Sequence, residues 1–200
     1  NAVNMPMQNA INIPAGYLQA PFFDPAASDA QNYGAIGTTI GHEVSHSFDD
    51  QGAQFDAQGR LRDWWTKEDL ARFKPASSKL VAQFNAYKPF RDLAVNGNLT
   101  LSENLADLAG LSASYDAYRA TLDNKRVTPQ ADRDFFLGFA HSERSKMRDA
   151  QLRRIVLTDG HAPSQYRAST VRNIDAWYDA FEVKPGQALY LAPGERVRVW

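Results

Sequence analysis

A stretch of helical pattern that contains three glycines constrains the fold of this chain more than any other segment. Apolar residues recur every four positions between 33 and 48, at Ile36, Ile40 and Val44, which is the spacing of one helix face. Glycine disfavours a helix, yet it interrupts this pattern at Gly34, Gly37 and Gly41. Glycines in a helix that must still form indicate that another backbone lies close against it. We therefore predict a buried helix over 33–48 with a second segment packed closely on it.

The rest of the chain predicts a mainly helical fold with a few short strands. Four prolines in residues 1–30 exclude a long helix from that part of the chain. The expected elements are an edge strand at 11–13, a chain reversal at 56–59, and helices from the N-cap Thr66 through a bend at Pro75, over 101–122, over 133–148 and over 169–181. The last residues end on Trp200, an apolar aromatic side chain that we expect to dock in the core.

The composition excludes several classes of site and partner. The chain contains no cysteine, so it forms no disulfide and no thiolate metal site. Its net charge of −1 gives no strong attraction for nucleic acid, and no apolar run approaches the roughly 20 residues that span a bilayer. Because 44% of the 200 residues are hydrophobic and no linker is evident, we expect one globular domain without a nucleic-acid partner or a membrane-spanning segment.

The sequence His42-Glu43-Val44-Ser45-His46 is typical of a zinc-binding helix. The two histidines are four positions apart, so their imidazoles share one helix face and can reach the same ion. Glu43 points about 100° around the helix axis from His42, which suits contact with a water molecule at the ion rather than with the ion itself. The alternative is a polar helix face with two solvated histidines. The neighbouring apolar residues disfavour that alternative, because free histidines in a buried helix are costly.

A hydrolytic zinc site needs three protein ligands and one open position, so a third ligand must come from elsewhere in the chain. His141, His161 and several acids are available. Glu103 is the best candidate, because it stands near the start of an apolar-striped helix where a carboxylate needs a partner. Asp107, one turn further on, and Asp49, three residues after the second histidine, can each accept a hydrogen bond from the distal nitrogen of a ligand histidine. For both aspartates the alternative is an ordinary surface charge.

These motifs resemble those of one known family, the neprilysin-type zinc metallopeptidases. The match is carried by GHEVSHSFDD at 41–50, DWWT at 63–66 and ENLAD at 103–107. Further similar segments occur in the same order along the chain, at 1–2, 13–23, 159–167 and 198–200. The resemblance therefore covers the whole chain, and the absence of cysteine is similar to bacterial members.

The resemblance implies a gluzincin, a thermolysin-like zinc metallopeptidase catalytic domain, mainly α with a few short β-strands. It implies that residues 1–200 are the C-terminal catalytic domain of a longer protein. The expected activity is that of a zinc-dependent endopeptidase that hydrolyses short peptides, with one Zn²⁺ per chain.

The resemblance also assigns roles to single residues. The zinc ligands would be His42, His46 and Glu103. The catalytic residues would be Glu43 as general base, His161 at the oxyanion, and Asp107, which with Asp49 orients the ligand histidines. The residues that hold the substrate would be Asn1, Ala2 and Arg167.

The implied partners are short peptides and a missing N-terminal portion of the same protein, a largely helical region that limits access to the site. We expect an extracytoplasmic protein, periplasmic or secreted, of bacterial type. Two other functions also fit a zinc site of this kind, a non-catalytic zinc-stabilised binding or scaffold module and a zinc hydrolase with a non-peptide substrate. The presence of every proposed catalytic residue disfavours the first, and only the family resemblance disfavours the second.

One segment departs from the family in a way that bears on specificity. Residues 139–144 align with a stretch where the family usually has apolar residues that line a pocket for the side chain after the scissile bond. This chain has His141, Ser142 and Glu143 there. A Glu143 carboxylate that faced the cleft would favour Lys or Arg in the substrate. The alternative is a surface ion pair with one of the basic residues that follow, Arg144, Lys146 or Arg148.

Overall fold

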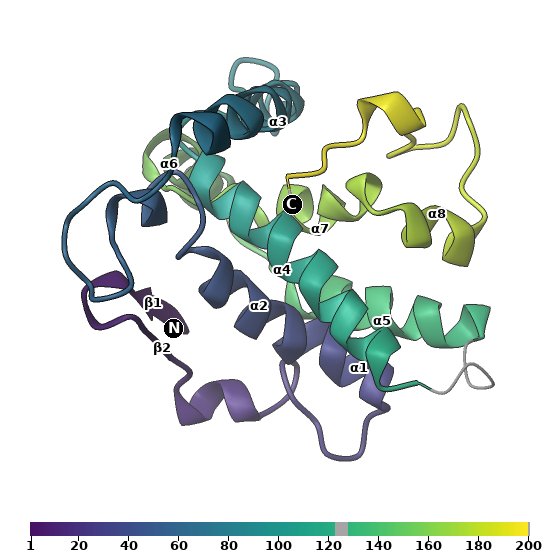
Figure 1. Ribbon diagram of the computed structural model, residues 1–200. Helices are drawn as coiled ribbons and strands as arrows, with labels where there is room; N and C mark the ends of the chain where they lie inside the picture. The colour runs from purple at the N-terminus through teal and green to yellow at the C-terminus, as the bar shows by residue number, and fades with distance from the viewer. Residues whose placement is uncertain (123–127, 200) are drawn as a thin grey trace.

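Two helices that lie side by side, α2 and α4, form the centre of the structure (Figure 1). The computed structural model describes residues 1–122 and 128–199. The strands are β1 (Val3–Met5) and β2 (Ala10–Asn12), and the helices are α1 (Asp29–Asn32), α2 (Thr38–Ser45), α3 (Lys67–Asn85), α4 (Leu101–Ala120), α5 (Pro129–Ser142), α6 (Asp149–Thr158), α7 (Ser164–Ala168) and α8 (Asp175–Phe181). The fold class predicted from the sequence, mainly helical with a few short strands, is confirmed.

Glycines allow the backbones of α2 and α4 to touch. A Cβ atom added to Gly110 of α4 would lie 2.4 Å from the backbone nitrogen of His42, and one added to Gly41 would lie 2.8 Å from the carbonyl oxygen of Gly110. No side chain fits at these distances, so glycine is required at both positions. A turn of π-helix over Tyr33–Gly37 precedes α2, and its Gly34 lies even closer to the backbone of α5, where an added Cβ atom would be 1.9 Å from the carbonyl oxygen of Phe135. The predicted close approach of a second backbone is confirmed, and it holds His42 against α4.

The apolar stripe of α2 and the turn after it does not face the core, and the prediction that it is buried is wrong. Ile40 is 40% exposed, Val44 46% and Phe48 44%. The buried face of α2 carries His42 and Glu43 instead. The glycine side of the helix packs on α4 because it permits the closer approach, and this turns the polar pair inward and the stripe outward.

Two apolar clusters fix α4 in the molecule. The first joins it to α5 and α8 through buried side chains that include Leu111, Tyr118, Phe135, Phe136 and Phe139. The second joins it to α3 and to the C-terminal segment through Leu80, Phe84, Leu105, Leu108 and Val197. Each buried side chain of this size contributes about 2 kcal/mol, so α4 is a rigid base for the polar residues of its first two turns. Trp200, which we expect to dock in the core, lies outside the described residues.

The predicted helices agree best with the structure where a capping residue is present. Thr66 caps α3 through a capping box with Asp69, and the helix continues through Pro75. The helix predicted over 101–122 is α4. The helix predicted over 133–148 is α5, which begins earlier, after Thr128 caps the N–H of Ala131, and ends earlier, at Ser142.

Two helical regions differ from the prediction. The helix α6, which has ten residues and buries Val156, was not predicted from the sequence. The helix predicted over 169–181 is interrupted at Ile174, whose backbone is extended, so a 3₁₀ turn over Ser169–Asn173 precedes α8. No described helix has the length and apolar character needed to cross a membrane.

The N-terminal sheet lies beside α2. Its strands β1 and β2 pair antiparallel with Asn4 opposite Ile11, so the predicted edge strand begins one residue earlier than expected. The Asn4 side chain donates a hydrogen bond of 2.7 Å to the carbonyl oxygen of Glu43, which ties the sheet to α2. The chain reversal predicted at 56–59 is confirmed, because the Asp56 N–H donates to the Arg60 carbonyl at 3.0 Å.

Candidate metal centre and cleft

Three side chains from α2 and α4 converge on one point. His42 and His46 lie one turn apart, with their Nε2 atoms 3.0 Å from each other. Glu103, in the first turn of α4, places Oε2 3.2 Å from His42 Nε2 and Oε1 3.6 Å from His46 Nε2. One ligand atom from each of the three residues lies within 4.8 Å of the other two. Two imidazoles and one carboxylate form one of the donor sets that catalytic zinc sites use.

Two aspartates set the orientation of the imidazoles. His42 Nδ1 lies 2.8 Å from Asp107 Oδ1, and His46 Nδ1 lies 2.7 Å from Asp49 Oδ2. A carboxylate accepts hydrogen bonds, so each Nδ1 carries the hydrogen and each Nε2 directs a lone pair toward the other ring. Two lone pairs at this distance repel each other unless a cation lies between them, so the geometry fits a metal ion.

A buried oxygen of Glu103 supports the same conclusion. Glu103 Oε2 receives no hydrogen bond from the described residues, although the Nε2 atoms of His42 and His161 lie 3.2 and 3.1 Å away. A buried carboxylate oxygen that lacks a hydrogen bond is costly. A cation bound by the two histidines would compensate it.

The surrounding carboxylates favour positive charge at this point. Burial works against a charged His42, but the carboxylates of Asp107 and Glu103 outweigh it and raise the pKa of His42 to about 10. Burial works against a charged Glu103 as well, yet His161 and His42 hold the pKa of its carboxyl well below the usual range. A metal ion and a proton therefore compete for the same lone pair on His42.

Asp49 is held firmly in its position beside His46. It is buried, and its Oδ1 accepts backbone hydrogen bonds from Gln51 at 2.8 Å and Gly52 at 2.7 Å. The Ser102 hydroxyl donates to the other oxygen, Oδ2, which also faces His46. A carboxylate with this many donors has one orientation, so the His46 ring that it contacts is held in place.

Asp107 joins the metal centre to Arg167. Arg167 donates two hydrogen bonds to its carboxylate, from Nε at 2.8 Å and from Nη2 at 2.7 Å, while His42 approaches Oδ1. Burial opposes the charge of Asp107, but Arg167 and His42 hold the pKa of its carboxyl far below the usual range. The buried ion pair thus keeps Asp107 an anion that orients His42.

A cleft of two adjoining pockets runs past the three converging side chains. The larger has a volume of about 310 Å³ and lies toward β1, and the smaller, of about 210 Å³, lies toward α5 and α7. Glu43 and His42 line both pockets. A larger, mostly apolar hollow of about 640 Å³ beside α4 contains none of the candidate site residues. The chemistry of the lining, not size, therefore identifies the cleft.

His161 also lines both pockets. Its Nδ1 lies 2.8 Å from Asp159 Oδ1, and its Nε2 lies 3.1 Å from Glu103 Oε2. The nearby Glu103 carboxylate raises the pKa of His161, and burial of the ring opposes this rise. The raised pKa favours the protonated form of this half-exposed imidazole, which can donate a hydrogen bond to an anionic group in the cleft.

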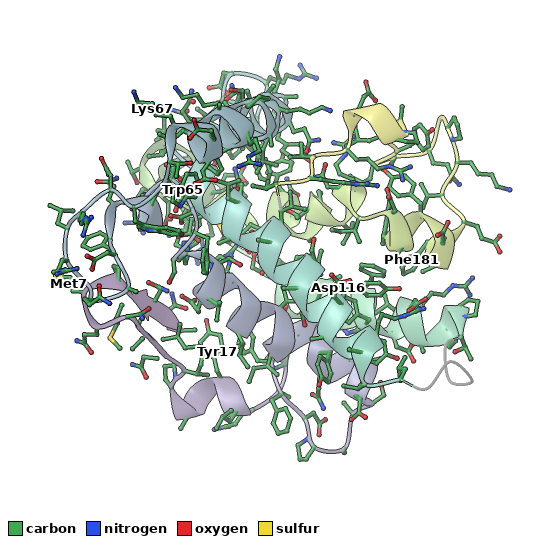
Figure 2. The ribbon with its side chains drawn as sticks, viewed as in Figure 1. Met7, Tyr17, Trp65, Lys67, Asp116 and Phe181 are labelled. Carbon is green, nitrogen blue, oxygen red and sulfur yellow. The ribbon has the colours of Figure 1, made fainter. Side chains whose placement is uncertain are left out.

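The remaining candidate residues line the same cleft. Asn1 lines both pockets, and its Oδ1 accepts a hydrogen bond of 2.6 Å from the Tyr17 hydroxyl. Figure 2 shows Tyr17 between the N-terminal segment and α2. Ala2 is buried in the wall of the larger pocket, and Arg167 lines the smaller one. The structure thus brings together all ten residues to which the family resemblance assigns a role.

Several contributors to the site were missed or misplaced. Ser102 and Asp159, which contact Asp49 and His161, carry no role in the sequence analysis, although each stands within two residues of a candidate. His141 is exposed and does not line the cleft. Its alternative roles as a metal ligand or a pocket wall are therefore excluded, because it lies on the outward face at the end of α5.

Comparison with known proteins identifies the family to which this chain is related. The chain matches the model of peptidase family M13 over residues 1–197. It is 40% identical to a neutral endopeptidase of Lactobacillus helveticus, over 100% of this chain and 30% of that protein. It is 36% identical to endothelin-converting enzyme 1 of Mus musculus, over 100% of this chain and 27% of that protein. The chain therefore spans less than a third of the length of these relatives.

Solved structures agree in fold as well as in sequence. The zinc metalloprotease Zmp1 of Mycobacterium tuberculosis, solved in complex with an inhibitor, matches with a TM-score of 0.94 and 43% identity, over 100% of this chain and 32% of that chain. PepO from Lactobacillus rhamnosis HN001 matches with a TM-score of 0.90 and 39% identity, over 100% of this chain and 31% of that chain. Because the family model matches residues 1–197 and the relatives agree in sequence and in fold, the chain belongs to peptidase family M13.

Proposed function

We propose that this chain is the catalytic portion of a zinc-dependent endopeptidase that hydrolyses short peptides. The observation that carries this proposal is the convergence of His42, His46 and Glu103 within 4.8 Å, with a fourth residue, Glu43, beside them in the cleft. The names of the relatives, neutral endopeptidase and zinc metalloprotease, agree with peptide hydrolysis.

One zinc ion per chain would be held by His42, His46 and Glu103. When bound, zinc supplies a Lewis acid that lowers the pKa of water to about 7 and polarises a carbonyl group. Asp107 and Asp49 orient the two imidazoles through their Nδ1 atoms, at 2.8 and 2.7 Å. Such carboxylate partners raise the basicity of ligand histidines and fix their rings.

Glu43 is the proposed general base. It lies next to His42 in sequence and lines both pockets of the cleft, so its carboxylate can accept a proton from the attacking water and deliver it to the leaving amine. His161 would donate a hydrogen bond from Nε2 to the developing oxyanion, while Asp159 holds its Nδ1 at 2.8 Å.

The peptide would be held on both sides of these groups. Asn1 and Ala2 lead into β1 along the larger pocket, where an extended peptide can pair with the backbone as an added strand. Asn4 anchors β1 to the carbonyl of Glu43 at 2.7 Å, so this edge has a fixed distance from the general base. Arg167 lines the smaller pocket, where it can bind the substrate backbone.

Residues 1–200 would then be the C-terminal catalytic domain of a longer protein. The relatives are more than three times as long, with this chain covering 30% and 27% of two of them. We propose that the additional region covers the cleft and restricts it to short peptides, and that the protein acts outside the cytoplasm.

Peptide hydrolysis by the zinc-loaded chain and by Glu43→Gln tests the proposed activity. Wild type should cleave a mixed peptide library, and a chelator should abolish cleavage. Glu43→Gln should keep its zinc and lose nearly all turnover, because glutamine cannot accept the proton. Turnover retained by Glu43→Gln would end the general-base assignment. No cleavage by zinc-loaded wild type would favour a zinc-stabilised scaffold module instead.

A further inference from the structure

The Glu143 side chain turns into the cleft at the end of α5. Glu143 is the C-cap residue of the helix, and only 16% of its side chain is exposed. No ion pair joins it to Arg144, Lys146 or Arg148, all of which are among the described residues. Its ion-pair partner is Arg167, on α7, at 4.0 Å. The surface ion pair considered from the sequence is therefore wrong.

Glu143 forms part of the wall of the smaller pocket. This pocket of about 210 Å³ has room for about seven waters, or for one long side chain. Its lining includes Thr38, His42, Glu43, Phe139, Glu143 and Arg167. Because His42 and Glu43 belong to the proposed centre, a side chain that fills this pocket comes from a residue that adjoins the scissile bond.

The charges around the pocket leave Glu143 without a close partner. Arg167 lies 2.7 and 2.8 Å from Asp107, so these two charges neutralise each other. Glu143 lies 4.0 Å from the same guanidinium, beyond hydrogen-bonding distance. Burial raises the pKa of Glu143 to about 7, and the neighbouring Asp107 adds to the rise, because too little positive charge compensates the carboxylate.

A cation in the pocket would supply what Glu143 lacks. The ammonium group of lysine or the guanidinium of arginine can form a charge-assisted hydrogen bond with its carboxylate. An apolar side chain would instead strip water from the carboxylate without replacing its hydrogen bonds, which is costly.

We propose that Glu143 makes the smaller pocket select a cationic side chain, Lys or Arg, in the peptide residue next to the scissile bond. This inference rests on the proposed peptidase function and names the substrate class of that site. Glu143 acts here as a specificity residue and takes no part in moving protons.

The test compares paired peptides that differ in one side chain, lysine or methionine, placed on either side of the cleaved bond. The measured quantity is the ratio of kcat/KM for the two peptides. Wild type should prefer lysine on one side by about tenfold, and Glu143→Gln, which keeps shape but loses charge, should reduce that ratio toward one. The matched control is Glu68→Gln, at an exposed position of α3, which should leave the ratio unchanged. A ratio unchanged by Glu143→Gln would overturn the inference.

Binding by the zinc-loaded Glu43→Gln variant separates this inference from the proposed activity. Calorimetry with the same peptide pairs should give about tenfold tighter binding of the lysine peptide, and addition of Glu143→Gln should remove the difference. Selective binding without hydrolysis by wild type would support the pocket and reject the peptidase. If wild type hydrolyses both peptides, and binding and cleavage are equal for the two, the cation-selective pocket is rejected and the proposed peptidase activity is retained.

Discussion

Replacing Asp107 with asparagine removes a buried charge that three hydrogen bonds hold. The residue is 2% exposed, and it accepts from Arg167 at 2.8 and 2.7 Å and from His42 at 2.8 Å. Asparagine has one acceptor oxygen and one donor nitrogen, so at least one donor would face another donor. Arg167 would also lose its close anionic partner.

The size of the effect follows from the burial of the pair. Removal of one partner from a buried ion pair costs about 3–5 kcal/mol. The Arg167 side chain keeps 20% exposure and has Glu143 at 4.0 Å, which compensates part of the loss, so the lower end, about 3 kcal/mol, applies. In a chain of this length, that lowers Tm by about 6–12 °C.

Thermal unfolding of the metal-free protein measures this loss without a contribution from zinc. The matched control is Asp92→Asn, because Asp92 and Arg153 form the same two-bond pair, at 2.9 and 2.9 Å, with side chains 67% and 43% exposed. We expect that control to lower Tm by about 2 °C or less. Combining Asp107→Asn with Arg167→Met should restore part of the stability, because the guanidinium that lost its close anionic partner is also removed. Equal shifts for the two aspartate variants would refute the reasoning.

Three further predictions follow from the packing and the charges. Gly110→Ala should destabilise the fold by about 2 kcal/mol or more, because its Cβ atom would lie 2.4 Å from the backbone nitrogen of His42. Gly194 has open space around it, so Gly194→Ala should have little effect in the same denaturant titration. Between pH 4.5 and 7, the metal-free wild type should lose up to about 3 kcal/mol of stability relative to Glu143→Gln. The reason is that the Glu143 carboxyl, with its raised pKa of about 7, keeps a proton in the folded state that it releases above pH 4.5 in the unfolded state. Parallel curves of stability against pH for the two proteins would contradict this. The chain alone should hydrolyse peptides more slowly than a version with the additional region of its relatives, because positioning of the substrate lowers the barrier by several kcal/mol, and equal kcat/KM values would contradict this.

The convergence of His42, His46 and Glu103 was predictable because it depends on local spacing in the sequence. His42 and His46 share one face of any helix that contains them, and Glu103 with Asp107 repeats this spacing on a second helix. The three glycines of the first helix indicated the close backbone contact that joins the two. These features need no knowledge of the rest of the fold.

Other features depend on which face of a helix finds a partner, and periodicity does not contain that information. The stripe of Ile40 and Val44 predicted the buried face of α2, but Gly41 and Gly110 allow a closer approach on another side. The end of α5 at Ser142 was also not predictable from the sequence pattern. The residues that follow are compatible with helix, so periodicity does not mark the end at Ser142.

The zinc content of three proteins tests the central claim most directly. After saturation with zinc and removal of the excess, wild type and Glu43→Gln should each retain about one zinc per chain. Glu103→Ala should retain far less, because two histidines without the carboxylate leave the ion with too few protein ligands, while the exposed Glu68→Ala should match wild type. Retention of about one zinc by Glu103→Ala, or its loss from Glu43→Gln, would contradict the assignment of His42, His46 and Glu103 as the metal ligands.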